Sequence, residues 1–306
     1  MLWIFLAILA YFLLAVSSLA DRYLLAGPLQ RPLVYTFYTG ITGIAAVIFI
    51  PFGFFVPQLW IIALSFAAGI ISVLALFALY HTTLHGNVSR VVPLVGAFLP
   101  IMTLILISSL HDGLEGVSLS KQLQVALFIL LPATFLLAAD PKERHYVPSA
   151  TDLIHAIITA FLFAAGFVSA KMVFEFLPFV NGFIWMRFGG FLAAASLLII
   201  PGVRATVFAH NPLKRKNILL PMVMGKGGGA LGFLAQQYAI AIANVGEIAI
   251  INALQGVQYL FLVVMVVVFG IRDPRILHET LSGKSLIVRG LGVALLAIGL
   301  FILLKQ

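Results

Sequence analysis

The stretch Gly40-Ile-Thr-Gly-Ile-Ala-Ala-Val-Ile-Phe-Ile-Pro51 recurs in altered form as Gly190-Phe-Leu-Ala-Ala-Ala-Ser-Leu-Leu-Ile-Ile-Pro201. The two stretches share a glycine, an alanine, an isoleucine and the final proline at an offset of 150 residues. A constant offset over a long stretch is the mark of an internal repeat. The sequence therefore predicts two copies of one unit, residues 1–140 and 151–306. Further matches are Ala10 with Ala160 at the same offset, and Gly69 with Gly227 and Tyr80 with Tyr238 at an offset of 158.

Composition indicates that these units lie in a membrane. The chain is 62% hydrophobic and only 9% charged, and its mean hydropathy is +1.15. A helix that crosses the hydrocarbon core needs about 20 mostly apolar residues. Ten runs have this character, and none shows the alternation of a membrane β-strand. We expect an all-α integral membrane protein with ten spans: 2–20, 33–51, 57–80, 88–108, 122–139, 151–174, 181–201, 218–242, 246–270 and 286–304.

Five spans in each copy is an odd number, so the second copy would enter the bilayer inverted relative to the first. Inverted repeats of this kind are typical of secondary transporters, which bind substrate between the two halves. We expect a multi-pass protein of the inner or plasma membrane. Thirteen basic residues follow odd-numbered spans and three lie on the opposite side, a bias that predicts both termini outside the cell.

Two segments that join neighbouring spans resemble EamA-type transporters of the drug/metabolite transporter superfamily. Thr83-Leu-His-Gly-Asn-Val-Ser-Arg-Val-Val-Pro-Leu-Val-Gly-Ala-Phe-Leu-Pro-Ile-Met-Thr103 is similar to the connection between the third and fourth helices of that family. Tyr238-Ala-Ile-Ala-Ile-Ala-Asn-Val-Gly-Glu247 repeats the turn, but Gln258 stands where the family has proline. The resemblance implies the ten-helix fold and transport of a small metabolite. It also implies that both termini are cytoplasmic, opposite to the charge bias.

Coupling to protons through the first helix is not expected. The small multidrug-resistance branch of the superfamily has an acidic residue in the middle of that helix. Here the middles of the first and sixth spans, 10–16 and 160–166, contain no carboxylate. The coupling ion, if there is one, stays open.

Polar residues within a span are candidates for function, because an ionisable group there costs several kcal/mol unless it meets a partner or water. The predicted substrate site is Lys226, Arg187, Gln237, Asn252, Gln255 and Tyr259. Two cations suggest a substrate with an anionic group. Alternatively, Arg187 pairs permanently with Glu175 or Glu247. Within the ninth span, Asn252, Gln255, Gly256 and Tyr259 share one face of the expected helix, and Glu247 and Gln258 share another.

Other classes of function have less support in the sequence. An intramembrane enzyme would need paired aspartates, a Gly-x-Ser-Gly nucleophile or a His-Glu-x-x-His zinc motif, and none is present. We expect no catalytic residues, no bound metal and no cofactor. The net charge of +8 lies in loops beside the bilayer, so nucleic acid is not an expected partner. The expected partners are a small-molecule substrate and lipid, with the protein a monomer or homodimer. A non-transporting channel or scaffold is the alternative.

Overall fold

The structure, a computed structural model, describes residues 2–26, 32–85, 88–110, 121–138, 150–209, 216–270 and 283–304. Every regular element in these ranges is helical, which confirms the all-α class. The elements are α1 (Leu2–Ala26), α2 (Pro32–Ile41), η1 (Thr42–Phe52), α3 (Leu59–His85), α4 (Val88–Leu110), α5 (Lys121–Ala138), α6 (Ala150–Phe176), α7 (Phe179–Ser196), η3 (Leu197–Ile199), α8 (Pro201–Ala209), α9 (Lys216–Ile242), α10 (Glu247–Ala253), α11 (Gln255–Gly270) and α12 (Gly283–Leu304).

Each of the ten predicted runs coincides with a helix or with two consecutive helices. The run 33–51 is divided between α2 and the 3-10 helix η1, and the run 246–270 between α10 and α11. The second copy also tightens into a 3-10 turn, η3, at the position equivalent to η1. The short helix α8 was not predicted. It begins at Pro201, whose fixed φ and missing N–H suit the first position of a helix.

Four stretches of the described chain are long and apolar enough to cross a membrane: Pro32–Phe52, Leu59–Thr82, Ala150–Phe176 and Phe179–Ile199. Several other helices contain shorter apolar stretches, among them Leu2–Ser18 and Leu94–Leu110. Large apolar side chains also face outward: Leu59 and Ile199 are each 81% exposed, and Phe128 is 75% exposed. An apolar outer surface of this extent is not typical of a soluble monomer and marks a surface for lipid or another protein.

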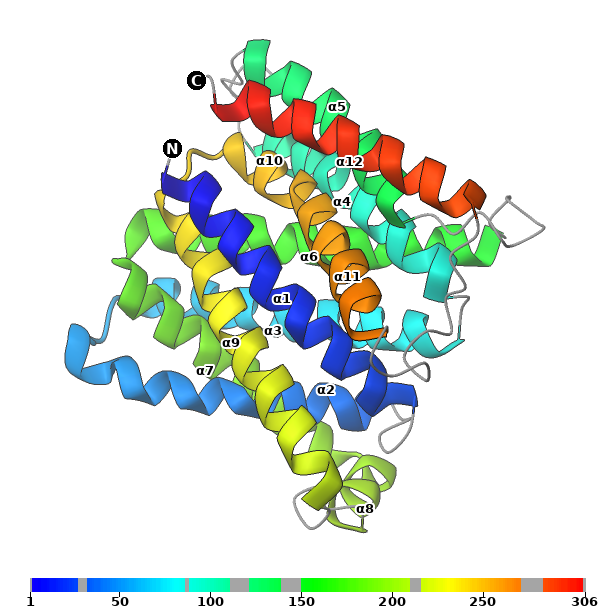
Figure 1. Ribbon diagram of the computed structural model, residues 1–306. Helices are drawn as coiled ribbons and strands as arrows, with labels where there is room; N and C mark the ends of the chain where they lie inside the picture. Colours follow the sequence, from blue (N-terminus) through cyan, green and yellow to red (C-terminus); the bar gives the residue numbers. More distant parts are fainter. Residues whose placement is uncertain are drawn as a thin grey trace.

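The helices pack mostly between the two copies (Figure 1). α1 lies beside α9, and α5 lies along α12. α6 packs against α3 and α4, while α7 packs against α2, η1 and α3. α10 contacts α4, and α11 contacts α1 and α5. Residues of both copies therefore share one core, whose fully buried side chains include Ile4, Ile107, Leu130, Ile250 and Leu254.

Glycines set the distance between α3 and α7. A Cβ atom added to Gly69 of α3 would lie 2.1 Å from the carbonyl oxygen of Met186 and 2.6 Å from the amide nitrogen of Gly190. In the reverse direction, a Cβ on Gly189 would lie 2.5 Å from Cα of Phe66. The two backbones are in direct contact, which only residues without a side chain permit.

Candidate functional site

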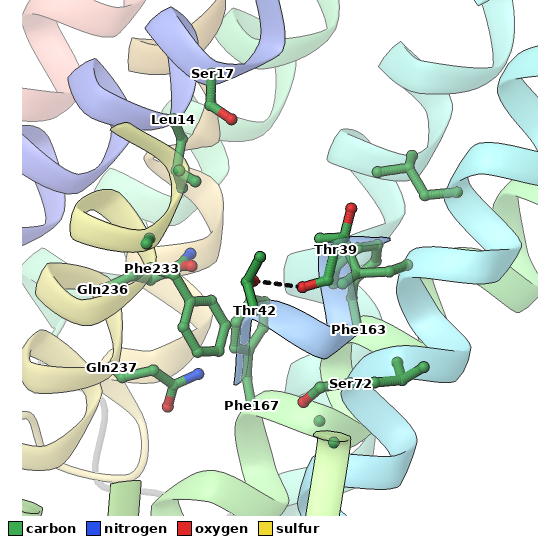
Figure 2. A pocket seen from close by; sticks show the side chains of 18 of the residues that line it. Leu14, Ser17, Thr39, Thr42, Ser72, Phe163, Phe167, Phe233, Gln236 and Gln237 are labelled. Atoms are coloured by element: carbon green, nitrogen blue, oxygen red, sulfur yellow. Dashed lines mark hydrogen bonds between the residues drawn. The ribbon is translucent and has the colours of Figure 1, made fainter. Parts of the chain in front are cut away.

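A cavity of about 260 Å³ lies among α1, α2, η1, α3, α4, α6, α7, α9 and α11, so both copies contribute to its wall. Figure 2 shows side chains of α1, α2, α3, α6 and α9 converging on it. Its apolar wall includes Phe163, Phe167, Phe183 and Phe233. Its polar and charged wall consists of Tyr11, Ser17, Ser18, Thr39, Thr42, Ser72, Tyr80, Arg187, Gln236, Gln237, Gln255 and Gln258.

The structure brings three of the predicted site residues together. Arg187, Gln237 and Gln255 all line the cavity. Asn252 and Tyr259 do not belong to the described lining. Asn252 is fully buried and its Nδ2 donates a hydrogen bond to Thr103 Oγ1 of α4 at 2.8 Å, while its Oδ1 has no described partner. The Lys226 side chain lies outside the described residues.

Tyr259 lies against α4 instead. A Cβ on Gly96 of α4 would be 3.1 Å from the Tyr259 hydroxyl and 3.3 Å from Gln255 Oε1. Gly96 thus makes room for two polar side chains of α11. Tyr259 therefore helps to position the helix from which Gln255 reaches the cavity.

Arg187 lies deep in the bundle. It is eight residues after Phe179, the first residue of α7, or about 12 Å along the helix axis. Its guanidinium carbon lies 5.0 Å from the centre of the Phe233 ring of α9, a cation–π contact. On the other side is η1, where a Cβ on Gly43 would lie 3.6 Å from Arg187 Nε. The cation is therefore held between the two copies.

Neither glutamate proposed as a permanent partner of Arg187 lies within ion-pair distance of it. Glu247, the first residue of α10, accepts a hydrogen bond from the backbone N–H of Asn244 at 2.7 Å, in the turn that precedes the helix. Glu175 is exposed. The other cation of this region, Lys171, donates to the carbonyl oxygens of Ala243 at 2.7 Å and Ala241 at 3.3 Å, at the end of α9. Lys171 and Glu247 thus bond backbone groups near helix ends, whereas Arg187 lies within its helix.

Four glutamines of the cavity fall into two pairs. Gln236 donates to the Tyr11 hydroxyl at 3.3 Å, and Gln258 donates to Ser18 Oγ at 2.8 Å, so both connect the second copy to α1. Gln237 Oε1 and Gln255 Oε1 are buried and accept no hydrogen bond from the described residues. Figure 2 shows the amides of Gln236 and Gln237 on the same side of the cavity. The oxygens of the second pair are therefore buried without a described donor.

Much of the polar lining was not predicted from the sequence, including Tyr11, Thr39, Thr42, Ser72 and Gln236. One signal in the sequence could have found part of it. Positions related by the repeat line the cavity together: Gly40 with Gly190, Ser72 with Ala230, and Leu79 with Gln237. Small or polar residues at both members of such a pair would mark a cavity between the copies.

The helix that carries Gln255 is broken next to it. α10 ends at Ala253, and the N–H of Val257 bonds to the carbonyl of Leu254 instead of that of Ala253. Two carbonyl oxygens at the break accept hydrogen bonds from side chains of other helices. Tyr11 donates to Ile251 at 2.7 Å, and Thr134 of α5 donates to Ala253 at 3.0 Å. Neighbouring helices thus satisfy the backbone groups that the break leaves free.

Comparison with known proteins bears on the fold alone. No protein-family model matches the chain, and no curated protein matches it. A solved crystal structure is similar with a TM-score of 0.67, covering 96% of this chain and 97% of the other at 17% sequence identity. At that identity the likeness concerns the arrangement of the helices and carries no function.

Proposed function

We propose that the protein is a secondary transporter of a small polar or amphipathic metabolite, related to the EamA-type proteins. Its ten helical stretches would span the inner or plasma membrane as two inverted five-helix repeats. The two halves would rock about the cavity, so that it opens to one side of the membrane at a time. The observation that carries the proposal is the polar cavity enclosed by helices of both copies.

The pattern of helix contacts supports a two-fold relation between the copies. Exchanging the copies turns the contact of α1 with α9 into that of α6 with α3, and both contacts are present. The contact of α4 with α6 likewise becomes that of α11 with α1. α5 with α12 and α4 with α10 exchange into themselves. Because each copy has five helical stretches, this relation would invert the second copy in the membrane.

The apolar outer face supports a location in lipid. Besides the four stretches with the length and composition of membrane spans, large side chains such as Ile48 and Phe52 of η1 are each 70% exposed. The polar groups, in contrast, gather inside, around the cavity. A protein with apolar residues outside and amides and hydroxyls inside is suited to carry a solute across a membrane.

Cysteine labelling tests the mechanism without knowledge of the substrate, because the chain contains no cysteine of its own. Ser72→Cys places a thiol on the cavity wall. In alternating access, an impermeant charged methanethiosulfonate should modify this thiol when added to either side of the membrane, in intact cells and in inverted vesicles. Ile48→Cys, on the apolar outer face, is the control and should stay unmodified from both sides.

Each other result has a definite meaning. If Ser72→Cys reacts from neither side, water does not reach the cavity and the transport proposal is wrong. Modification from one side only contradicts alternating access. A steady ionic current through the purified protein in planar bilayers would identify a channel instead.

A further inference from the structure

The charge in the cavity points to the class of substrate. Arg187 is the one charged side chain among the described residues that line it, and it lies near the middle of α7. Its guanidinium lies over the Phe233 ring, and a Cβ on Gly43 would lie 3.6 Å from its Nε; neither neighbour neutralises a full charge. A cation in this position is stable only if an anion or water meets it. The ligand would supply that anion.

The shape and the hydrogen-bond donors of the Arg187 guanidinium indicate which kind of anion it would bind. Its N–H groups make no hydrogen bond to any described residue, and the Phe233 ring covers its centre at 5.0 Å. A planar guanidinium donates two parallel hydrogen bonds to a carboxylate, so a carboxylate is matched in shape and in charge. Beside a single described cation, one of the two negative charges of a dianion would have no counter-charge. A monocarboxylate is therefore the best match.

The side-chain amides of Gln237 and Gln255 indicate a second property of the ligand, namely hydrogen-bond donors. Gln237 Oε1 and Gln255 Oε1 are buried acceptors without a donor among the described residues. Burying such an acceptor unpaired costs about 1–3 kcal/mol. A carboxylate cannot donate to them, so the ligand must carry N–H or O–H groups as well.

The volume of the cavity and the composition of its wall indicate what the rest of the ligand is like. The cavity volume of about 260 Å³ is below the roughly 300–1,000 Å³ of sites for drug-sized ligands. Phe163, Phe167 and Phe183 give it an apolar side. A small apolar or aromatic body would pack there.

We propose that the cavity binds a small monocarboxylate that also carries N–H or O–H donors, with Arg187 holding the carboxylate and the amide oxygens of Gln237 and Gln255 accepting from the donors. This inference rests on the proposed transport function and names its substrate class. The labelling of Ser72→Cys needs no ligand, so transport and substrate class can fail independently.

Three related ligands separate the contribution of the carboxylate charge to the affinity from the contribution of the hydroxyl donor. Mandelate has a carboxylate, a hydroxyl and a phenyl ring; mandelamide lacks the charge, and phenylacetate lacks the hydroxyl. Their affinities for the purified full-length protein are measured from the ligand-dependent rise in melting temperature. Mandelate should bind about tenfold to a hundredfold more tightly than mandelamide, the range expected for hydrogen bonds to a charged group. Phenylacetate should lie between them.

Variants assign these differences to residues. Arg187→Met should remove the preference for mandelate over mandelamide, and Gln237→Leu should reduce the preference for mandelate over phenylacetate. Arg204→Met is the control, because Arg204 is an exposed arginine of α8 outside the described lining. The proposal is overturned if mandelamide binds as tightly as mandelate, if Arg187→Met keeps the preference, or if none of the three probes binds. If Arg187→Met does not fold, the affinities of the wild-type protein for mandelate and mandelamide still test the proposal.

Discussion

Gly69→Ala should destabilise the protein by about 3 kcal/mol or more, at the upper end of the cost of overpacking a core. The added methyl group would lie 2.1 Å from the Met186 carbonyl oxygen and 2.6 Å from the Gly190 amide nitrogen. Both are backbone atoms of α7, which cannot rotate away as the end of a side chain can. α3 and α7 would have to separate along their length. A lower melting temperature of the purified protein in detergent measures the effect.

The repeat supplies a matched control. Gly227 of α9 is equivalent to Gly69 in the second copy, yet a Cβ there would meet no atom within 4 Å. Gly227→Ala should leave the stability unchanged or raise it by up to about 1 kcal/mol, because alanine is the better helix former. Equal melting temperatures for the two variants would show that α3 and α7 do not make direct backbone contact.

Thr134→Val should destabilise the protein by about 1–3 kcal/mol, the cost of leaving a buried acceptor without a donor. The Thr134 hydroxyl shares its one proton between the Leu130 carbonyl of its own helix at 2.9 Å and the Ala253 carbonyl at the break between α10 and α11 at 3.0 Å. Valine keeps the shape of threonine without the hydroxyl. The break would then expose an unpaired carbonyl in the core. The loss is measured as the free energy of unfolding in a denaturing detergent.

Thr36→Val is the corresponding control. Thr36 is fully buried as Thr134 is, but its hydroxyl donates only to Pro32 of its own helix, a carbonyl that the helix backbone can also satisfy. We expect a change of less than about 1 kcal/mol there. A cost at Thr134 no greater than that at Thr36 would mean that the side-chain hydrogen bond is not needed at the break.

The repeat explains how much of the fold was predictable. Apolar runs of about 20 residues predicted the ten helical stretches, and the glycines shared by the copies include Gly40 and Gly190, which both line the cavity. Helix formation follows from properties that are local in the chain, namely apolar length and spacing. The ten-span inverted architecture, the EamA resemblance and the absence of enzymatic activity stay predictions.

The position of the binding residues was less predictable, and the segment after Glu247 shows why. Asn252, Gln255 and Tyr259 were predicted to share one face and to bind the substrate with it. In the structure all three lie against α4, Asn252 at Thr103 and the other two at Gly96. Of the three, Gln255 alone belongs to the described lining of the cavity, together with Gln258 from the other predicted face. The carbonyls at the break accept hydrogen bonds from the hydroxyls of Tyr11 and Thr134, which lie more than a hundred residues away in the chain.

The sequence by itself determined that the protein is all-helical, where its ten long helical stretches lie and that Arg187 lies within one of them. The tertiary structure decided which polar side chains meet. Among the described residues, it left Arg187 without a carboxylate beside it, bound Gln236 and Gln258 to α1, and left the amide oxygens of Gln237 and Gln255 without a donor. The physical reason is that helix formation depends on neighbours in the chain. The partners of a buried polar group, in contrast, come from whichever helices pack against it.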